Sequence, residues 1–222
     1  MKKVKENNNS KKFLIVAICL FVAFAIWTVL VGFNVFESIN DSVHGFIFSW
    51  YSEMATKIFK TFTFLGSTLW IVSFLAGLVL IFTIFKKHGH SISMIVMILT
   101  ALGLNNLVKI IIREPRPTYM MINEPTFAYP SGHTMCSTAV YGFLIYLISR
   151  TNIPKKYKWF YSILLTLITL GIMTSRIYLG AHYFSDIFGG VLASLATIFL
   201  GIYFDKKYNL IEKLDNLKKK AK

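Results

Sequence analysis

The chain has 222 residues, of which 55% are hydrophobic and 15% charged, and its mean hydropathy is +0.58. These proportions exclude an ordinary soluble domain, in which about 25% of the residues are charged. The formal net charge of +14 does not indicate a nucleic-acid-binding protein, because the Lys and Arg residues stand between apolar runs and not in one cluster. The composition therefore predicts an integral membrane protein.

Six apolar segments separated by charged or turn-rich residues predict an all-α fold, an integral membrane bundle of six transmembrane helices. We expect one domain over residues 1–222, with a basic N-terminus at 1–11, the spans within 12–204 and a basic tail at 205–222. The N-terminal apolar run has no small-residue cleavage site, so a retained helix is expected and not a signal peptide. The expected spans are 12–33, 63–85, 91–112, 134–149, 157–174 and 184–204.

An amphipathic pattern lies between the first two spans. Trp50 and Tyr51 suit the headgroup level of a membrane, so the pattern predicts an amphipathic helix in the outer interface. A connecting helix packed against its neighbours would have the same pattern. The apolar residues that recur at helical spacing are Phe46, Ile47, Trp50, Tyr51, Met54 and Ile58.

The basic residues are divided unequally between the two sides of such a bundle. The N-terminus, the turn after the second span, the loop after the fourth and the tail together hold 18 of the 24 Lys and Arg residues. Because cytoplasmic segments are rich in these residues, both termini are predicted to be cytoplasmic, with the Lys-rich tail contacting anionic lipid. The outer side holds only Lys57, Lys60, Lys109, Arg113, Arg116 and Arg176.

Three of the four Arg residues therefore lie on the side that topology depletes of positive charge. Ionisable groups near membrane depth are costly and by default indicate a functional site. The first outer segment runs from Lys109 to Arg116-Pro117, where prolines end a helix. Its Lys and Arg suit phosphate oxygens, although a basic helix end before proline is also common as a snorkelling terminus.

The second outer segment is Tyr129-Pro130-Ser131-Gly132-His133, which leads into the fourth span. Pro, Ser and Gly predict a turn, and the backbone N–H groups at the helix N-terminus that follows can bind an anion. His133 would lie there as a proton donor. An ordinary helix start has the same residues, so this segment alone leaves both interpretations open.

The third outer segment runs from Ser175-Arg176 through His182 to Asp186. His182 and Asp186 are four residues apart and would share one face of a helix. A carboxylate that accepts from one imidazole nitrogen leaves the lone pair of the other nitrogen free, which produces a nucleophilic His. A His–Asp pair on a helix surface is the alternative interpretation, but an unpaired carboxylate in an apolar helix is costly.

All three segments fall on one predicted side, and together they resemble the type 2 phosphatidic acid phosphatase superfamily. The stretch from Lys109 to Arg116-Pro117 is similar to its first motif, Pro130 to His133 to its second, and Ser175 to Asp186 to its third. No motif position departs from the pattern. The resemblance extends from about residue 60 to residue 204.

The resemblance implies a metal-independent phosphatase with no cofactor, in which His182 attacks phosphorus to form a phosphohistidine. Asp186 would orient the imidazole of His182, and His133 would protonate the leaving oxygen. The phosphate oxygens would be held by Lys109, Arg116, Arg176, Ser131 and the backbone of Gly132. Three fixed cations could then stabilise the charge that Mg²⁺ stabilises in other phosphoryl-transfer enzymes.

The remaining candidate residues are expected to have no catalytic role. Cys19 and Cys136 lie in apolar stretches, so no disulfide is predicted. His88 and His90 lie in a turn too short to supply the full set of ligands for a metal. The expected partners are a lipid phosphate substrate and membrane lipids, with no nucleic acid, and nothing in the sequence indicates an oligomeric state.

Three other function classes fit the sequence less well. A lipid transporter or flippase usually has internal repeats and helices broken at mid-membrane, and the sequence shows neither. Relatives with haloperoxidase activity are soluble, and a scaffold would not need three motifs. Among lipid phosphatases, an outward site favours undecaprenyl pyrophosphate, which is released on that side. Phosphatidylglycerophosphate, made at the cytoplasmic leaflet, and phosphatidic acid are the alternatives.

Overall fold

The structure of the chain is a computed structural model that describes residues 2–217, with side chains described for residues 10–216. The last four Lys residues of the expected basic tail lie outside these ranges. At the N-terminus, the side chains of Lys2, Lys3 and Lys5 also lie outside them. The described residues form helices and no strand, which confirms the predicted all-α fold. The helices are α1 (Lys2–Gly32), α2 (Glu37–Phe48), α3 (Glu53–Leu65), α4 (Thr68–Ile84), α5 (His88–Ile112), α6 (Gly132–Ser149), α7 (Lys155–Tyr178), α8 (Phe184–Tyr208) and α9 (Leu210–Leu217).

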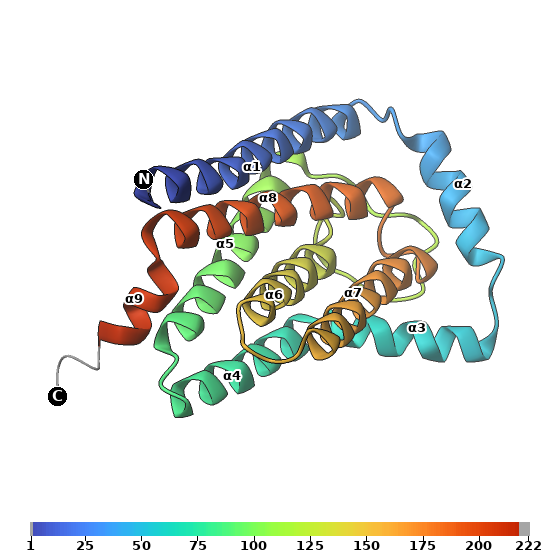
Figure 1. The fold of residues 1–222 in the computed structure, drawn as a ribbon. Helices are drawn as coiled ribbons and strands as arrows, with labels where there is room; N and C mark the ends of the chain where they lie inside the picture. The colour runs from blue at the N-terminus through green and yellow to red at the C-terminus, as the bar shows by residue number, and fades with distance from the viewer. Residues whose placement is uncertain (1, 218–222) are drawn as a thin grey trace.

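Helix α6 lies at the centre, between α5, α7 and α8, while α1 runs along the outside of α8 (Figure 1). Its first two turns are almost entirely buried and include Thr134, Ser137 and Thr138. A helix covered on all sides by other helices has little contact with lipid, so it can carry hydroxyl side chains that a lipid-facing helix would not.

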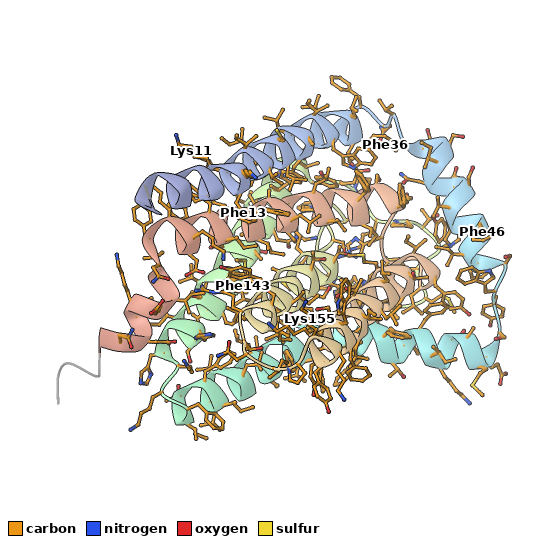
Figure 2. The ribbon with its side chains drawn as sticks, viewed as in Figure 1. Lys11, Phe13, Phe36, Phe46, Phe143 and Lys155 are labelled. Atoms are coloured by element: carbon orange, nitrogen blue, oxygen red, sulfur yellow. The ribbon has the colours of Figure 1, made fainter. Side chains whose placement is uncertain are left out.

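Large apolar side chains are exposed on the outer helices. Phe143 of α6 points into the bundle, whereas Lys11, near the start of α1, points away from it (Figure 2). A water-soluble protein rarely exposes so continuous an apolar surface, and lipid is the solvent that suits it. Residues more than half exposed include Ile15, Ile26, Leu69, Leu99, Ile111 and Leu167.

Four helices of the described chain are long and apolar enough to cross a membrane, and a fifth span is possible if α3 and α4 are counted as one broken segment. The four are Ser10–Gly32, His88–Ile112, Lys155–Tyr178 and Phe184–Tyr208. Helix α6, predicted as the fourth of six spans, does not meet this criterion. Its polar side chains at the bundle centre explain the difference.

The prediction of one continuous amphipathic helix between the first two spans is wrong, because two helices lie there. The chain leaves the helical conformation after Phe48, and Ser52 begins a new helix by accepting a hydrogen bond from the backbone N–H of Ala55 at 3.0 Å. The predicted span 63–85 is also divided, because α3 and α4 meet at 51°. There Ser67 begins α4 in the same way, accepting from Trp70 N at 3.2 Å.

The two ends of the bundle differ in structure. At one end lie the start of α1, the α4–α5 turn and α9; at the other lie the long 113–131 segment and the α7–α8 loop (Figure 1). Helix α9, which the sequence did not predict, packs against the start of α5, where Asp215 accepts a hydrogen bond from Gly89 N at 2.7 Å. The candidate site lies at the opposite end.

Candidate active site

The three outer segments predicted from the sequence meet at one end of the bundle. Arg116 donates to the carbonyl oxygen of Ala181 at 2.7 Å, which joins the segment after α5 to the loop before α8. Ser131 N donates to the carbonyl oxygen of Asp186 at 3.2 Å, which joins the start of α6 to the start of α8. Residues that are far apart in the sequence therefore surround one point.

Helix α5 ends one turn after Lys109. Arg113 has a left-handed backbone conformation with φ of 54°, and the two prolines that follow cannot continue a helix. The Lys109 side chain is 8% exposed and donates to the carbonyl oxygen of Phe127. Arg116 Nε donates to the carbonyl oxygen of Thr126 at 2.6 Å, so the 126–127 backbone holds both cations.

His182 lies between a carboxylate and a guanidinium. Its Nδ1 is 3.3 Å from Asp186 Oδ2, and its Nε2 is 3.3 Å from an Nη of Arg116. Burial lowers the pKa of His182 well below its ordinary value, and the positive charges of Arg176 and Arg116 lower it further. The imidazole is therefore neutral at pH 7, with Nδ1–H available to donate to Asp186 and an Nε2 lone pair on the opposite side.

Asp186 has two roles at the start of α8. Its Oδ2 accepts the backbone N–H of Tyr183 at 2.9 Å and so caps the helix, while Oδ1 is buried without a hydrogen-bond partner among the described residues. The prediction that His182 and Asp186 share a helix face is wrong in detail. His182 precedes the helix, and the carboxylate reaches back to it from the first turn.

The second segment forms the N-terminus of α6. The Ser131 hydroxyl accepts from Thr134 Oγ1 at 3.1 Å, and a Cβ on Gly132 would lie 3.3 Å from Asn105 Oδ1. His133 is half-buried, and a Cβ on Gly66 would lie 3.2 Å from its ring. The bend between α3 and α4 therefore lies against the His133 imidazole, which has no hydrogen bond within the described residues.

Arg176 is fully buried in the last turn of α7. It donates to Thr63 Oγ1 at 2.6 Å and to Glu124 Oε1, while its Nε has no partner in the described part of the chain. One Nη group is thus held by α3 and the other by the loop that carries Glu124. A fixed, partly unsatisfied guanidinium is suited to binding an oxyanion.

Glu124 is a site residue that the sequence did not predict. Its carboxylate pairs with Arg176 and lies 3.8 Å from Arg116. Burial opposes its ionisation, but the charge of Arg176 and the hydrogen bond to it outweigh burial and lower the pKa of Glu124. The available signal was an acidic residue in the same outer loop as Arg116.

Two further histidines, His44 and His90, contact other residues and not this cluster. His44 stacks on Tyr119 with ring centroids 3.8 Å apart, and His90 lies 3.1 Å from Asp215 at the opposite end of the bundle. Among the described residues, no group of three or more His, Cys, Asp or Glu side chains is arranged to hold a metal ion.

Comparison with known proteins gives the family of the chain. Residues 90–209, slightly more than half of the chain, match the PAP2 superfamily. The chain belongs to this superfamily. The match contains all three outer segments, so the sequence-based resemblance is confirmed, and the protein is a phosphatase.

Individual relatives of this PAP2 protein cover most of its length. Phosphatidylglycerophosphatase B of Bacillus subtilis is 28% identical over 200 residues, which are 86% of this chain and 95% of that protein. The undecaprenyl-diphosphatase of Sulfolobus acidocaldarius is 25% identical over 201 residues, 86% of this chain and 90% of that protein.

A solved relative has the same arrangement of helices. The crystal structure of the transmembrane PAP2 type phosphatidylglycerolphosphate phosphatase from Bacillus subtilis superposes with a TM-score of 0.76 at 27% identity, covering 86% of this chain and 96% of that one. With the apolar helices described above, this likeness establishes a multi-pass membrane protein.

Proposed function

We propose that the protein hydrolyses a lipid phosphate or diphosphate through a phosphohistidine on His182. The observation that carries this proposal is the position of the imidazole, with Asp186 at 3.3 Å from Nδ1 and Arg116 at 3.3 Å from Nε2. A phosphoryl group drawn to Arg116 would face the nitrogen that has the free lone pair.

In the first step, Nε2 of His182 forms a bond to phosphorus, and the bond from phosphorus to the leaving oxygen breaks. His133 gives its proton to that oxygen. The imidazole of His182 becomes positively charged as the new bond forms, and the Asp186 carboxylate stabilises that charge. In the second step, His133 takes a proton from water, the water oxygen bonds to phosphorus, and the nitrogen–phosphorus bond breaks.

The phosphoryl oxygens are held by two kinds of donor in this proposal. The side chains of Lys109, Arg116 and Arg176 supply positive charge, and Ser131 and the Gly132 backbone supply neutral donors at the helix N-terminus. Because charge on the equatorial oxygens is the main feature to stabilise, these cations are expected to support activity in the presence of EDTA.

Undecaprenyl pyrophosphate is the substrate that we propose, with phosphatidylglycerophosphate and phosphatidic acid as alternatives. The proposed outward orientation carries this preference. The relatives are named for different substrates, one for phosphatidylglycerophosphate and one for undecaprenyl diphosphate. The test is phosphate release by purified protein from these three lipids in EDTA, with His182→Ala as the background control. Release from none of them would contradict the proposed substrates.

We further propose six spans, with α3 and α4 as one bent span and α6 as the central one. Both termini would then be cytoplasmic and the site extracytoplasmic. A Cys at the exposed position of Asn123 should react with an impermeant maleimide in sealed cells, while a Cys at Asn152, also exposed, should not. Cys19 and Cys136 must first be replaced. The reverse labelling would invert the protein and favour phosphatidylglycerophosphate.

A further inference from the structure

A pocket of about 420 Å³ lies beside the candidate active site, between the last turns of α5 and residues 125–127. Lys109 and Arg116 form part of its wall, together with Asn106, Ile110 and Phe127. Ile110 is 63% exposed and Phe127 43% exposed, so the pocket opens on the apolar outer surface of the bundle. Its wall therefore changes from apolar to cationic over a short distance.

Arg116 connects this pocket to the reacting atoms. The same guanidinium that lines the pocket lies 3.3 Å from Nε2 of His182. A phosphoryl group at His182 would consequently be separated from the pocket only by the Arg116 side chain. The groups of a lipid substrate that are next to the reacting phosphate would therefore reach the pocket.

Asn106 is an independent indication of a ligand in the pocket. Its side chain is exposed on a helix whose neighbouring Leu107 and Ile111 are 56% and 66% exposed, and its amide has no hydrogen bond within the described part of the chain. A polar side chain is costly on a lipid-facing surface, where it normally faces a polar cavity or a partner. Asn106 precedes Lys109 by three residues, so the two lie on one face of α5.

The charges of the pocket favour an anion. Lys109 and Arg116 line it together with one carboxylate, Glu114. Arg116 has no ion pair with Glu114, because its guanidinium instead meets backbone carbonyls and Glu124. An anionic group would thus meet two cations and the free amide of Asn106, with apolar surface beside them for a hydrocarbon chain.

We propose that this pocket binds the lipid-linked phosphate of a diphosphate substrate and that Asn106 is a specificity-determining residue. This inference rests on the proposed function. While His182 attacks the terminal phosphorus, Lys109 and Arg116 lie between the two phosphates and contact both. The second phosphate also meets Asn106, and the chain leaves over Ile110. A lipid monophosphate has no group that fills this subsite, so the subsite selects diphosphates.

The test compares two substrates that differ only in the second phosphate, a polyprenyl diphosphate and the matching polyprenyl monophosphate. Asn106→Leu should lower kcat/KM for the diphosphate about 10- to 100-fold, as expected for a lost hydrogen bond to a charged group. It should change kcat/KM for the monophosphate less than about twofold. Asn106→Asp, which has the same shape, should reduce diphosphate hydrolysis at least as much, because its charge repels phosphate. Leu99→Ala, an exposed position of α5 outside the pocket, is the control and should affect neither.

Equal losses on both substrates, or no loss on either, would overturn the inference. A selective loss of phosphatidic acid hydrolysis would instead assign the pocket to a glycerolipid and also overturn it. A wild-type protein that hydrolyses monophosphates but not the diphosphate would refute the subsite and leave the proposed function standing, whereas hydrolysis of neither would refute both. As a readout without lipid, methylenediphosphonate should inhibit aryl phosphate hydrolysis more strongly than phosphate does, and Asn106→Leu should remove that difference.

Discussion

Helix α8 has a buried carboxylate at each end, and the two have different surroundings. Asp205, near its C-terminus, is 3% exposed and fully partnered. One of its oxygens accepts from Ile211 N at 3.1 Å, and the other from Tyr146 and Arg150. Asp186, near the N-terminus, is fully buried but leaves Oδ1 without a partner in the described part of the chain.

The arginines at the two ends, Arg150 on the surface and the buried Arg176, differ in the same direction. Arg150 pairs with Asp205, whose remaining contacts hold α6, α8 and α9 together. Arg176 has an unpartnered Nε, and its carboxylate partner comes from a loop. Buried polar groups are normally satisfied, so an unsatisfied pair is a cost that a structural role would not explain. This difference is the one expected if the α9 end stabilises the fold and the opposite end binds the proposed charged substrate.

The largest effect on turnover is expected for His182→Ala. This substitution removes the proposed nucleophile, so hydrolysis of lipid phosphates should fall to the uncatalysed background. Thermal unfolding in detergent should remain cooperative, which would show that the loss is chemical. Substantial activity in a folded His182→Ala protein would contradict the assignment of this end of the bundle to catalysis.

A smaller effect, which depends on the substrate, is expected for His133→Ala. Loss of a general acid typically reduces a rate by about 10²- to 10⁴-fold, and the loss should appear with a lipid, whose leaving oxygen needs a proton. An aryl phosphate with an acidic phenol as leaving group should lose much less. Single-turnover release of the leaving group measures this step alone. Equal losses on the two substrates would argue against the acid role.

The pH dependence should report the charges around His182. Burial and the cations lower its pKa, so the neutral nucleophile should persist below pH 6.5, and kcat/KM should fall only at lower pH, as His182 gains a proton. Arg116→Gln removes one of those positive charges. The pKa of His182 should then rise, and the acid limb of the profile should move to higher pH. An unchanged limb would mean that Arg116 does not act on the imidazole.

The smallest effect on turnover is expected for Asp205→Ala, at the other end of α8. This substitution leaves the buried backbone N–H of Ile211 without its acceptor, and an unsatisfied buried donor commonly costs about 1–3 kcal/mol of stability. The midpoint of thermal unfolding should fall clearly, while kcat/KM at a temperature where the protein is folded should match wild type. A specific loss of activity, with unchanged stability, would break the comparison between the two ends.

Much of this arrangement could be predicted because apolar runs and three short segments carry the information locally. The C-terminal end of α5 and the start of α6 follow from proline, serine and glycine chemistry within a few residues. The breaks at Ser52 and Ser67 could not be predicted so easily, since apolar spacing continues through both positions. A serine cap competes with helix continuation, and tertiary packing decides the outcome.

Other features depend on contacts between distant residues. Glu124 gains its importance from Arg176, which lies 52 residues later, and neither residue type alone indicates the pair. Tyr146, the partner of Asp205 on α6, is equally remote at 59 residues, whereas Ile211 on α9 follows Asp205 by only six residues. Helix α9 was predicted only as part of a basic tail, because its apolar residues are too few to indicate a span and become meaningful only against α5.

Identification of the phosphorylated residue tests the central claim most directly. The His133→Ala protein would be reacted with a ³²P-labelled aryl phosphate, whose good leaving group allows the first step while loss of the base slows the second. The account predicts a single alkali-stable, acid-labile label on the peptide that contains His182, and no label when His182→Ala is added. Label at another residue, or release of the phenol with no labelled protein, would contradict it.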